Sequence, residues 1–115
     1  PTLRQLMTQA LNRNGHTVAL ADTGYMGLDL LLKYRNIKLV VLDLHLPGLN
    51  GVETLRECKR IREDVAVIVA SGFAQYFDTD GVSRMSDVFM RKPFSMKELV
   101  ENCEHLLGSV NTKAS

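Results

Sequence analysis

Hydrophobic residues follow two patterns along the chain, and the two patterns alternate. Continuous apolar runs at 39–42 and 65–70 are typical of strands buried on both faces of a parallel sheet. Shorter apolar runs at 18–21 and 88–90 predict two further strands. Between the runs, apolar residues recur every three or four positions, as in helices that bury one face. A helix followed by four strand–helix units predicts an α/β fold with a doubly wound parallel sheet.

Capping and turn residues set the ends of the predicted helices. Pro1 suits the first turn of the first helix, which stops at Asn14-Gly15 because glycine takes a left-handed cap at no steric cost. Asp22-Thr23-Gly24 offers an N-cap for the second helix, which runs to Tyr34. The third helix starts at Asn50-Gly51.

The last helix opens with the capping-box sequence Ser95-Met96-Lys97-Glu98 and ends at Gly108. Residues 73–86 hold Gly81 and several turn-favouring polar residues, so we expect only a short or frayed helix there. The pattern therefore predicts one domain over 1–108, followed by a polar tail or linker stub at 109–115.

Helical spacing divides the side chains of these helices into an inward and an outward set. The inward set is Leu3, Leu6, Met7, Ala10, Leu11, Leu28, Leu31, Leu32, Val52, Leu55, Ile61, Leu99, Cys103, Leu106 and Leu107. The outward set of the third helix is Arg56, Lys59, Arg60 and Arg62.

Composition narrows the function classes. With 115 residues, 45% of them hydrophobic, and a formal net charge of +1, the chain fits one globular domain and lacks the concentrated basic charge of a nucleic-acid-binding surface. Its two cysteines, Cys58 and Cys103, have no metal-type spacing, which favours buried free thiols in a reducing compartment. The sequence shows no apolar run of the roughly 20 residues that span a bilayer, so we expect a cytoplasmic protein.

Three chemically distinct groups follow three of the predicted strands: the Asp43 carboxylate, the Ser71 hydroxyl and the Lys92 ammonium. Neighbouring parallel strands lie roughly 5 Å apart, so their carboxyl ends bring these groups to one edge of the sheet. Aspartate can form an acyl phosphate, and a cation and a hydroxyl can neutralise and bind phosphoryl oxygens. The constellation predicts phosphoryl chemistry on Asp43.

At these residues the chain resembles the receiver domains of two-component response regulators. The resemblance rests on residues 39–51 (LVVLDLHLPGLNG), 67–72 (VIVASG) and 89–94 (FMRKPF), with a supporting turn at Gly15-His16. It covers essentially all 115 residues. It implies a flavodoxin-like fold with strand order 2-1-3-4-5.

The resemblance also implies roles for single residues. Asp43 matches the phosphoacceptor and Lys92 the lysine that binds the phosphoryl oxygens, with Pro93 after a cis peptide bond. Ser71 matches the hydroxyl residue that moves toward the phosphate, and Phe89 the aromatic switch whose rotamer reports phosphorylation to the output face.

A magnesium site and its modulating residues are implied in the same way. Asp43 and the backbone carbonyl of His45 match Mg²⁺ ligands, and the side chains of His45 and Phe73 match positions that tune autodephosphorylation. The acidic pair that helps to hold the metal in this family, together with its strand, falls upstream of Pro1. Two explanations remain: the sequence begins within the domain, or the protein is a truncated receiver.

The leading hypothesis is a signalling receiver, phosphorylated by a histidine kinase or phosphotransfer protein and not an enzyme beyond self-catalysed phosphorylation and dephosphorylation. Its partners would include an output domain or a second copy bound through the last helix–strand–helix face, and neither nucleic acid nor membrane. The alternative is a pseudo-receiver that binds a protein partner without phosphorylation. A dehalogenase-like phosphohydrolase would need an aspartate where His45 stands.

Overall fold

The computed structural model describes residues 2–43, 51–71 and 85–111. The chain forms two compact units. The sheet unit comprises Ala21–Pro93, and the helical unit comprises Pro1–Leu20 together with Phe94–Ser115.

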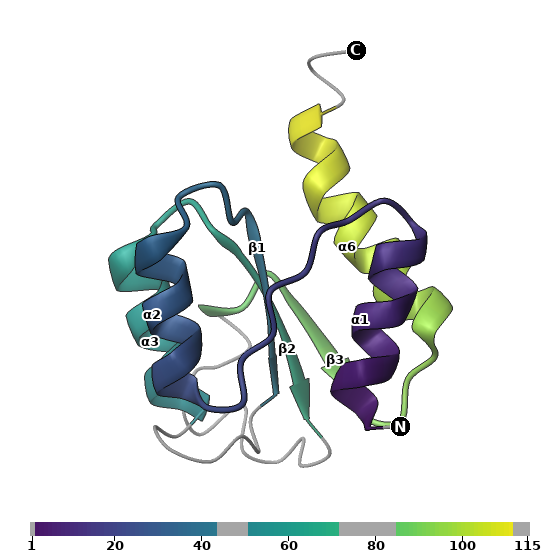
Figure 1. Ribbon diagram of the computed structural model, residues 1–115, viewed down its shortest axis with the longest axis horizontal. Helices are drawn as coiled ribbons and strands as arrows, with labels where there is room; N and C mark the ends of the chain where they lie inside the picture. Colours follow the sequence, from purple (N-terminus) through teal and green to yellow (C-terminus); the bar gives the residue numbers. More distant parts are fainter. Residues whose placement is uncertain (1, 44–50, 72–84, 112–115) are drawn as a thin grey trace. The chain divides into compact units, whose positions relative to one another are not determined.

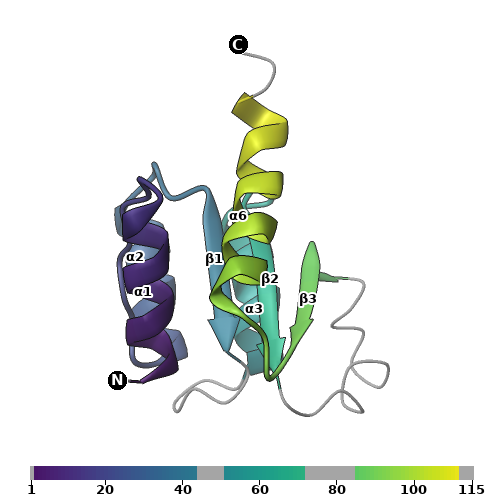
Figure 2. The ribbon, with the colours of Figure 1, turned by 90° about the vertical axis from the view of Figure 1, so that its right-hand side faces the viewer.

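The sheet unit contains three parallel strands, β1 (Leu39–Asp43), β2 (Ala66–Ser71) and β3 (Val88–Arg91), in the order β1-β2-β3. The three arrows run in the same direction in Figure 2. The register pairs Asp43 with Ala70 and Ser71 with Arg91. The predicted parallel α/β sheet is confirmed, and the carboxyl ends of its strands reach the same edge.

Two helices, α2 (Gly24–Lys33) and α3 (Gly51–Ile61), lie side by side against one face of this sheet (Figure 1). Thr23 is the N-cap of α2, as predicted, and its hydroxyl oxygen accepts a hydrogen bond from the Met26 N–H at 3.1 Å. The buried residues of the shared core are Leu31, Leu42, Leu55, Cys58, Val65, Val67 and Val69.

The central strand β2 is buried on both faces. Val67 and Val69 face the core shared with α2 and α3, while Ile68 and Ala70 alternate to the opposite face and are buried too. This is the burial that the continuous apolar run predicts, since a strand with no solvated face has no place for polar side chains.

In the helical unit, α1 (Leu3–Arg13) and α6 (Met96–Asn111) lie alongside each other (Figure 1). Thr2 and Gln5 form a capping box at the start of α1, and Gly15 follows the helix with φ +87°. The Ser95 hydroxyl accepts a hydrogen bond from the Glu98 N–H at 3.0 Å, which confirms the predicted N-cap of α6. No helix among the described residues is long and apolar enough to cross a membrane.

Two strand predictions were wrong. Residues 18–21 are not a strand, because extended backbone forms a strand only within a sheet, and the sheet of the described residues consists of β1, β2 and β3. β1 is not buried on both faces: only its Leu42 is buried. Within the described sheet β1 pairs with β2 alone, so its other edge is covered by no neighbouring strand.

The helix boundaries and faces also need corrections. α1 begins at Leu3 with Thr2 as its N-cap, and Pro1, which the sequence placed in the first turn, lies outside the described residues. Leu32 is exposed because α2 turns Leu28 and Leu31 to the core and Leu32 away from it; Leu6 of α1 is exposed beside the buried Met7 in the same way. 

Gly108 does not end α6, which continues to Asn111. Among the described glycines only Gly15 has a positive φ, so Gly108 keeps helical geometry. Of the predicted short helix at 73–86, residues 73–84 lie outside the described residues.

Candidate functional site

The side chains of Asp43 and Lys92 meet at the carboxyl edge of the sheet. Asp43 is the last residue of β1, and Lys92 directly follows β3. Lys92 Nζ donates a hydrogen bond to Asp43 Oδ2 at 2.9 Å. The two side chains are 18% and 25% exposed, respectively, so the ion pair is largely shielded but can still be reached from solvent.

Ser71 lies between these two residues along the edge. It is the last residue of β2, one position beyond Ala70, the register partner of Asp43, and it pairs with Arg91, which precedes Lys92. The structure thus brings the backbone positions of Asp43, Ser71 and Lys92 to the ends of three neighbouring strands.

Phe89 lies on β3 opposite Val69 and is half-buried against the core cluster. The peptide bond between Lys92 and Pro93 is cis, as the resemblance implied. His45 and Phe73, which the resemblance matches to positions that tune autodephosphorylation, lie outside the described residues.

The cysteines are two buried free thiols, as predicted. Burial raises the pKa of Cys58 to about 11 and does the same for Cys103. Both thiols are therefore neutral at physiological pH, and neither takes part in the site at the sheet edge.

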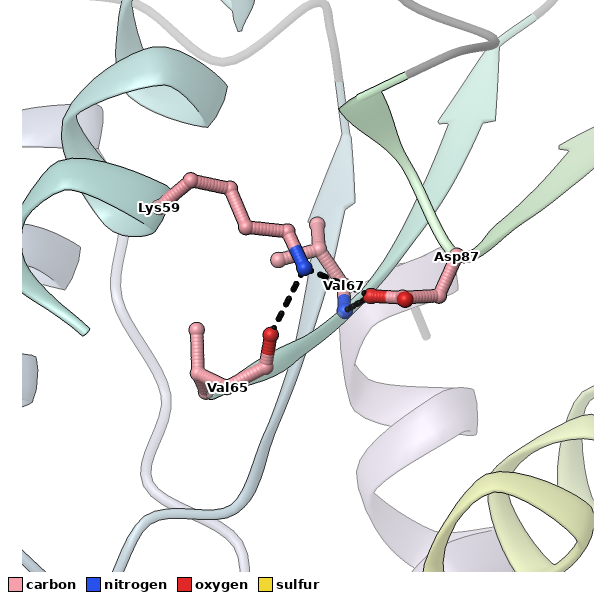
Figure 3. A network of polar contacts seen from close by, with 4 residues as sticks. All are labelled: Lys59, Val65, Val67 and Asp87. Atoms are coloured by element: carbon pink, nitrogen blue, oxygen red, sulfur yellow. Dashed lines mark hydrogen bonds and ion pairs between the residues drawn. The ribbon is translucent and has the colours of Figure 1, made fainter. Parts of the chain in front are cut away.

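The sequence interpretation missed a polar network at the amino ends of β2 and β3 (Figure 3). Lys59 Nζ, from α3, donates hydrogen bonds to the Val65 carbonyl and to Asp87 Oδ2, both at 2.8 Å. The same carboxylate oxygen accepts the Val67 N–H at 2.7 Å. Helical spacing had placed Lys59 outward, and no local pattern could have paired it with a residue 28 positions away.

The family model described as the response regulator receiver domain matches residues 1–104. The chain belongs to this family. Receiver domains of response regulators are components of two-component signalling, and the family match confirms the resemblance stated from the three motifs.

Relatives and solved structures agree with this assignment. The chain is 31% identical over 112 residues to a probable transcriptional regulatory protein of a Picosynechococcus species, covering 91% of this chain and 45% of that protein. It is 30% identical over 106 residues to the response regulator MprA of Mycobacterium sp. (strain KMS), covering 91% and 46%. The chain thus spans about half the length of these curated relatives.

Among solved structures, the response regulator TrrA of Thermotoga maritima, in complex with Mg²⁺ and BeF, is 27% identical with a TM-score of 0.80, covering 90% of this chain and 89% of that one. The receiver domain of NtrX from Brucella abortus is 28% identical with a TM-score of 0.82, covering 92% and 90%.

Proposed function

We propose that this receiver domain accepts a phosphoryl group on the Asp43 carboxylate from a histidine kinase or a phosphotransfer protein. The observation that carries the proposal is the 2.9 Å contact between Lys92 Nζ and Asp43 Oδ2, which puts a cation beside the nucleophile where the charge of a phosphoryl group would arrive. The family match supports it.

The transfer balances as a simple displacement at phosphorus. A carboxylate oxygen of Asp43 forms the new P–O bond, the P–N bond of the phosphohistidine donor breaks, and the imidazole nitrogen of the donor keeps the electron pair. Lys92 neutralises the phosphoryl oxygens during and after the transfer, and the Ser71 hydroxyl donates to one of them. Such positioning and charge neutralisation supply most of the catalysis in phosphoryl transfer.

The residues of the site match only some of the oxygen ligands that a bound Mg²⁺ ion would need. The described residues hold no group of three His, Cys, Asp or Glu side chains that could bind a metal by themselves. Mg²⁺ is usually held by one or two carboxylates, phosphate oxygens and several waters, and Asp43 and the His45 carbonyl are hard oxygen ligands of this kind. When bound, the metal would offset negative charge between the carboxylate and the phosphoryl group.

The remaining features of the proposal follow the family. We place β1, β2 and β3 as the last three strands of a sheet of order 2-1-3-4-5, within a domain of residues 1–108. Phe89 and Ser71 form the switch, and His45 and Phe73 tune dephosphorylation. The output face, formed by the last helix–strand–helix segment, binds an output domain or a second copy in the cytoplasm, and the domain itself binds neither nucleic acid nor membrane.

Labelling with radioactive acetyl phosphate tests the proposal. We expect the full chain to be labelled in the presence of Mg²⁺ and Asp43→Asn to lose all labelling, because an amide cannot form the acyl phosphate. Asp29→Asn, which removes an exposed carboxylate of α2, is the matched control and should label normally. Labelling of Asp43→Asn at the wild-type level, or no labelling of the wild-type chain by phosphodonor or kinase, would refute the assignment.

A further inference from the structure

The strand that delivers Lys92 to the site is short and, within the described part of the chain, has a neighbouring strand on one side only. β3 has four residues and pairs with β2 alone among the described strands. A slip by one residue would move its end by about 3.3 Å and turn every side chain to the other face of the sheet. The 2.9 Å contact between Lys92 and Asp43 could not survive such a slip, so something must fix the register of β3.

The residue at the amino end of β3 does this with two hydrogen bonds to a single residue of β2. The Asp87 N–H donates to the Val67 carbonyl at 2.9 Å, and Asp87 Oδ2 accepts the Val67 N–H at 2.7 Å. The carboxylate therefore acts where a backbone carbonyl of the strand would otherwise pair. The backbone N–H and the carbonyl of Val67 are thus both bonded to Asp87. This pairing is compatible with only one register of β3 against β2.

Lys59 joins this pairing to α3 (Figure 3). Its ammonium contacts Asp87 Oδ2 and the Val65 carbonyl, each at 2.8 Å, so it bridges the segments that lead into β2 and β3. The side chains of Lys59 and Asp87 are 26% and 38% exposed, and bonds to backbone groups hold the pair in one arrangement. We name Lys59 and Asp87 the register clamp.

We propose that the register clamp positions Lys92 for phosphoryl transfer to Asp43. The inference rests on the proposed function. Lys92 lies five residues after Asp87 in the sequence, roughly 16 Å along an extended strand, so neither clamp residue touches the reacting atoms. They are positioning residues that act through β3.

The test compares variants that break the clamp to different extents in the full chain. Asp87→Ala removes both contacts of the carboxylate, whereas Asp87→Asn keeps an oxygen that can accept the Val67 N–H and loses only the charge that faces Lys59. Lys59→Met removes the ammonium and keeps the length of the side chain. We expect the maximal rate of labelling by acetyl phosphate to fall at least fivefold in Asp87→Ala and less in Asp87→Asn, since misplacement by about 1 Å can cost about 100-fold.

Two controls separate positioning from general weakening of the fold. Ile61→Val loosens the core from the same helix without touching Asp87, and Arg60→Ala removes an exposed ion pair with Glu57 on α3. Both should keep the wild-type rate. A positioning role also predicts that the acetyl phosphate concentration at half-maximal rate stays unchanged, and that interstrand NMR contacts between β2 and β3 change in Asp87→Ala.

Three outcomes decide the matter. A wild-type labelling rate in Asp87→Ala overturns the inference. So does an equal loss of labelling rate in Ile61→Val, provided that the two variants have the same melting temperature. If the wild-type chain is not labelled at all, the proposed function fails. The clamp is then tested by the NMR contacts alone, and it is overturned if they persist in Asp87→Ala.

Discussion

The ammonium of Lys92 contacts the carboxylate of Asp43 at 2.9 Å although their strands are not neighbours. β2 lies between β1 and β3, so the lysine side chain spans the end of the central strand. The length of lysine is needed for this reach, and in the proposed function its compact charge would suit a phosphoryl group bound between the two side chains.

Removing the Lys92 ammonium should slow phosphorylation strongly. We expect Lys92→Ala to lower the labelling rate by about 100-fold or more, because loss of one preorganised charge-stabilising group typically costs that much. Arg91→Ala removes the adjacent, exposed cation and is the matched control, with an expected rate within about twofold of wild type, since an exposed cation contributes little. The rates are measured by single-turnover labelling with acetyl phosphate, and similar losses in both variants would contradict the role of Lys92.

Part of this site could be predicted from the sequence, and part could not. Asp43 and Lys92 each follow an apolar run, and parallel topology brings strand ends together whatever lies between them. Lys59 and Asp87 carry no such local signal, because charged residues on a helix face or before a strand are usually solvated. Their contact exists only after α3 has packed on the sheet.

Truncation to alanine should cost much more stability at Leu55 than at Leu32, although the sequence pattern placed both residues in the inward set. Leu55 is fully buried between α3 and the sheet, whereas Leu32 is 60% exposed. We expect Leu55→Ala to lower the free energy of unfolding by about 2–5 kcal/mol and Leu32→Ala by less than about 0.5 kcal/mol. Urea unfolding followed by circular dichroism measures both, and comparable losses would contradict the assigned faces of α2 and α3.

Replacing Gly15 or Gly108 by alanine should change the stability of the fold in opposite directions. Gly15 has φ +87°, where a Cβ is strained although no atom lies within 4 Å of it, so Gly15→Ala should destabilise the fold by about 1 kcal/mol. Gly108 is helical with equally open surroundings, so Gly108→Ala should stabilise it by about 0.5–1 kcal/mol. Melting temperatures compare the two variants, and a loss in Gly108→Ala would contradict the continuous helix α6.

The fold was predictable where burial is decided locally and not where it depends on a neighbour. The four buried residues Val67–Ala70 form a strand enclosed on both faces, so any sequence able to sit there must be apolar throughout. Residues 18–21 and β1 look similar in sequence, yet strand formation and burial there depend on which backbone pairs beside them. Hydrophobic periodicity carries no information about that partner.

Alkaline pH should destabilise the protein through its two buried thiols. Burial raises the pKa of both Cys58 and Cys103 from 9.0 to about 11, so between these values the unfolded chain releases protons that the folded chain keeps. Stability is then fully present below pH 9 and falls as the pH rises toward 11, by up to about 1.4 kcal/mol per pH unit for each thiol.

Urea unfolding at pH 7, 9 and 10 measures the decline. The decisive comparison is with Cys103→Ala, whose stability starts lower but should decline less steeply with pH. Equal slopes for the wild type and this variant would show that the thiol ionises alike in the folded and unfolded chain, contrary to its burial.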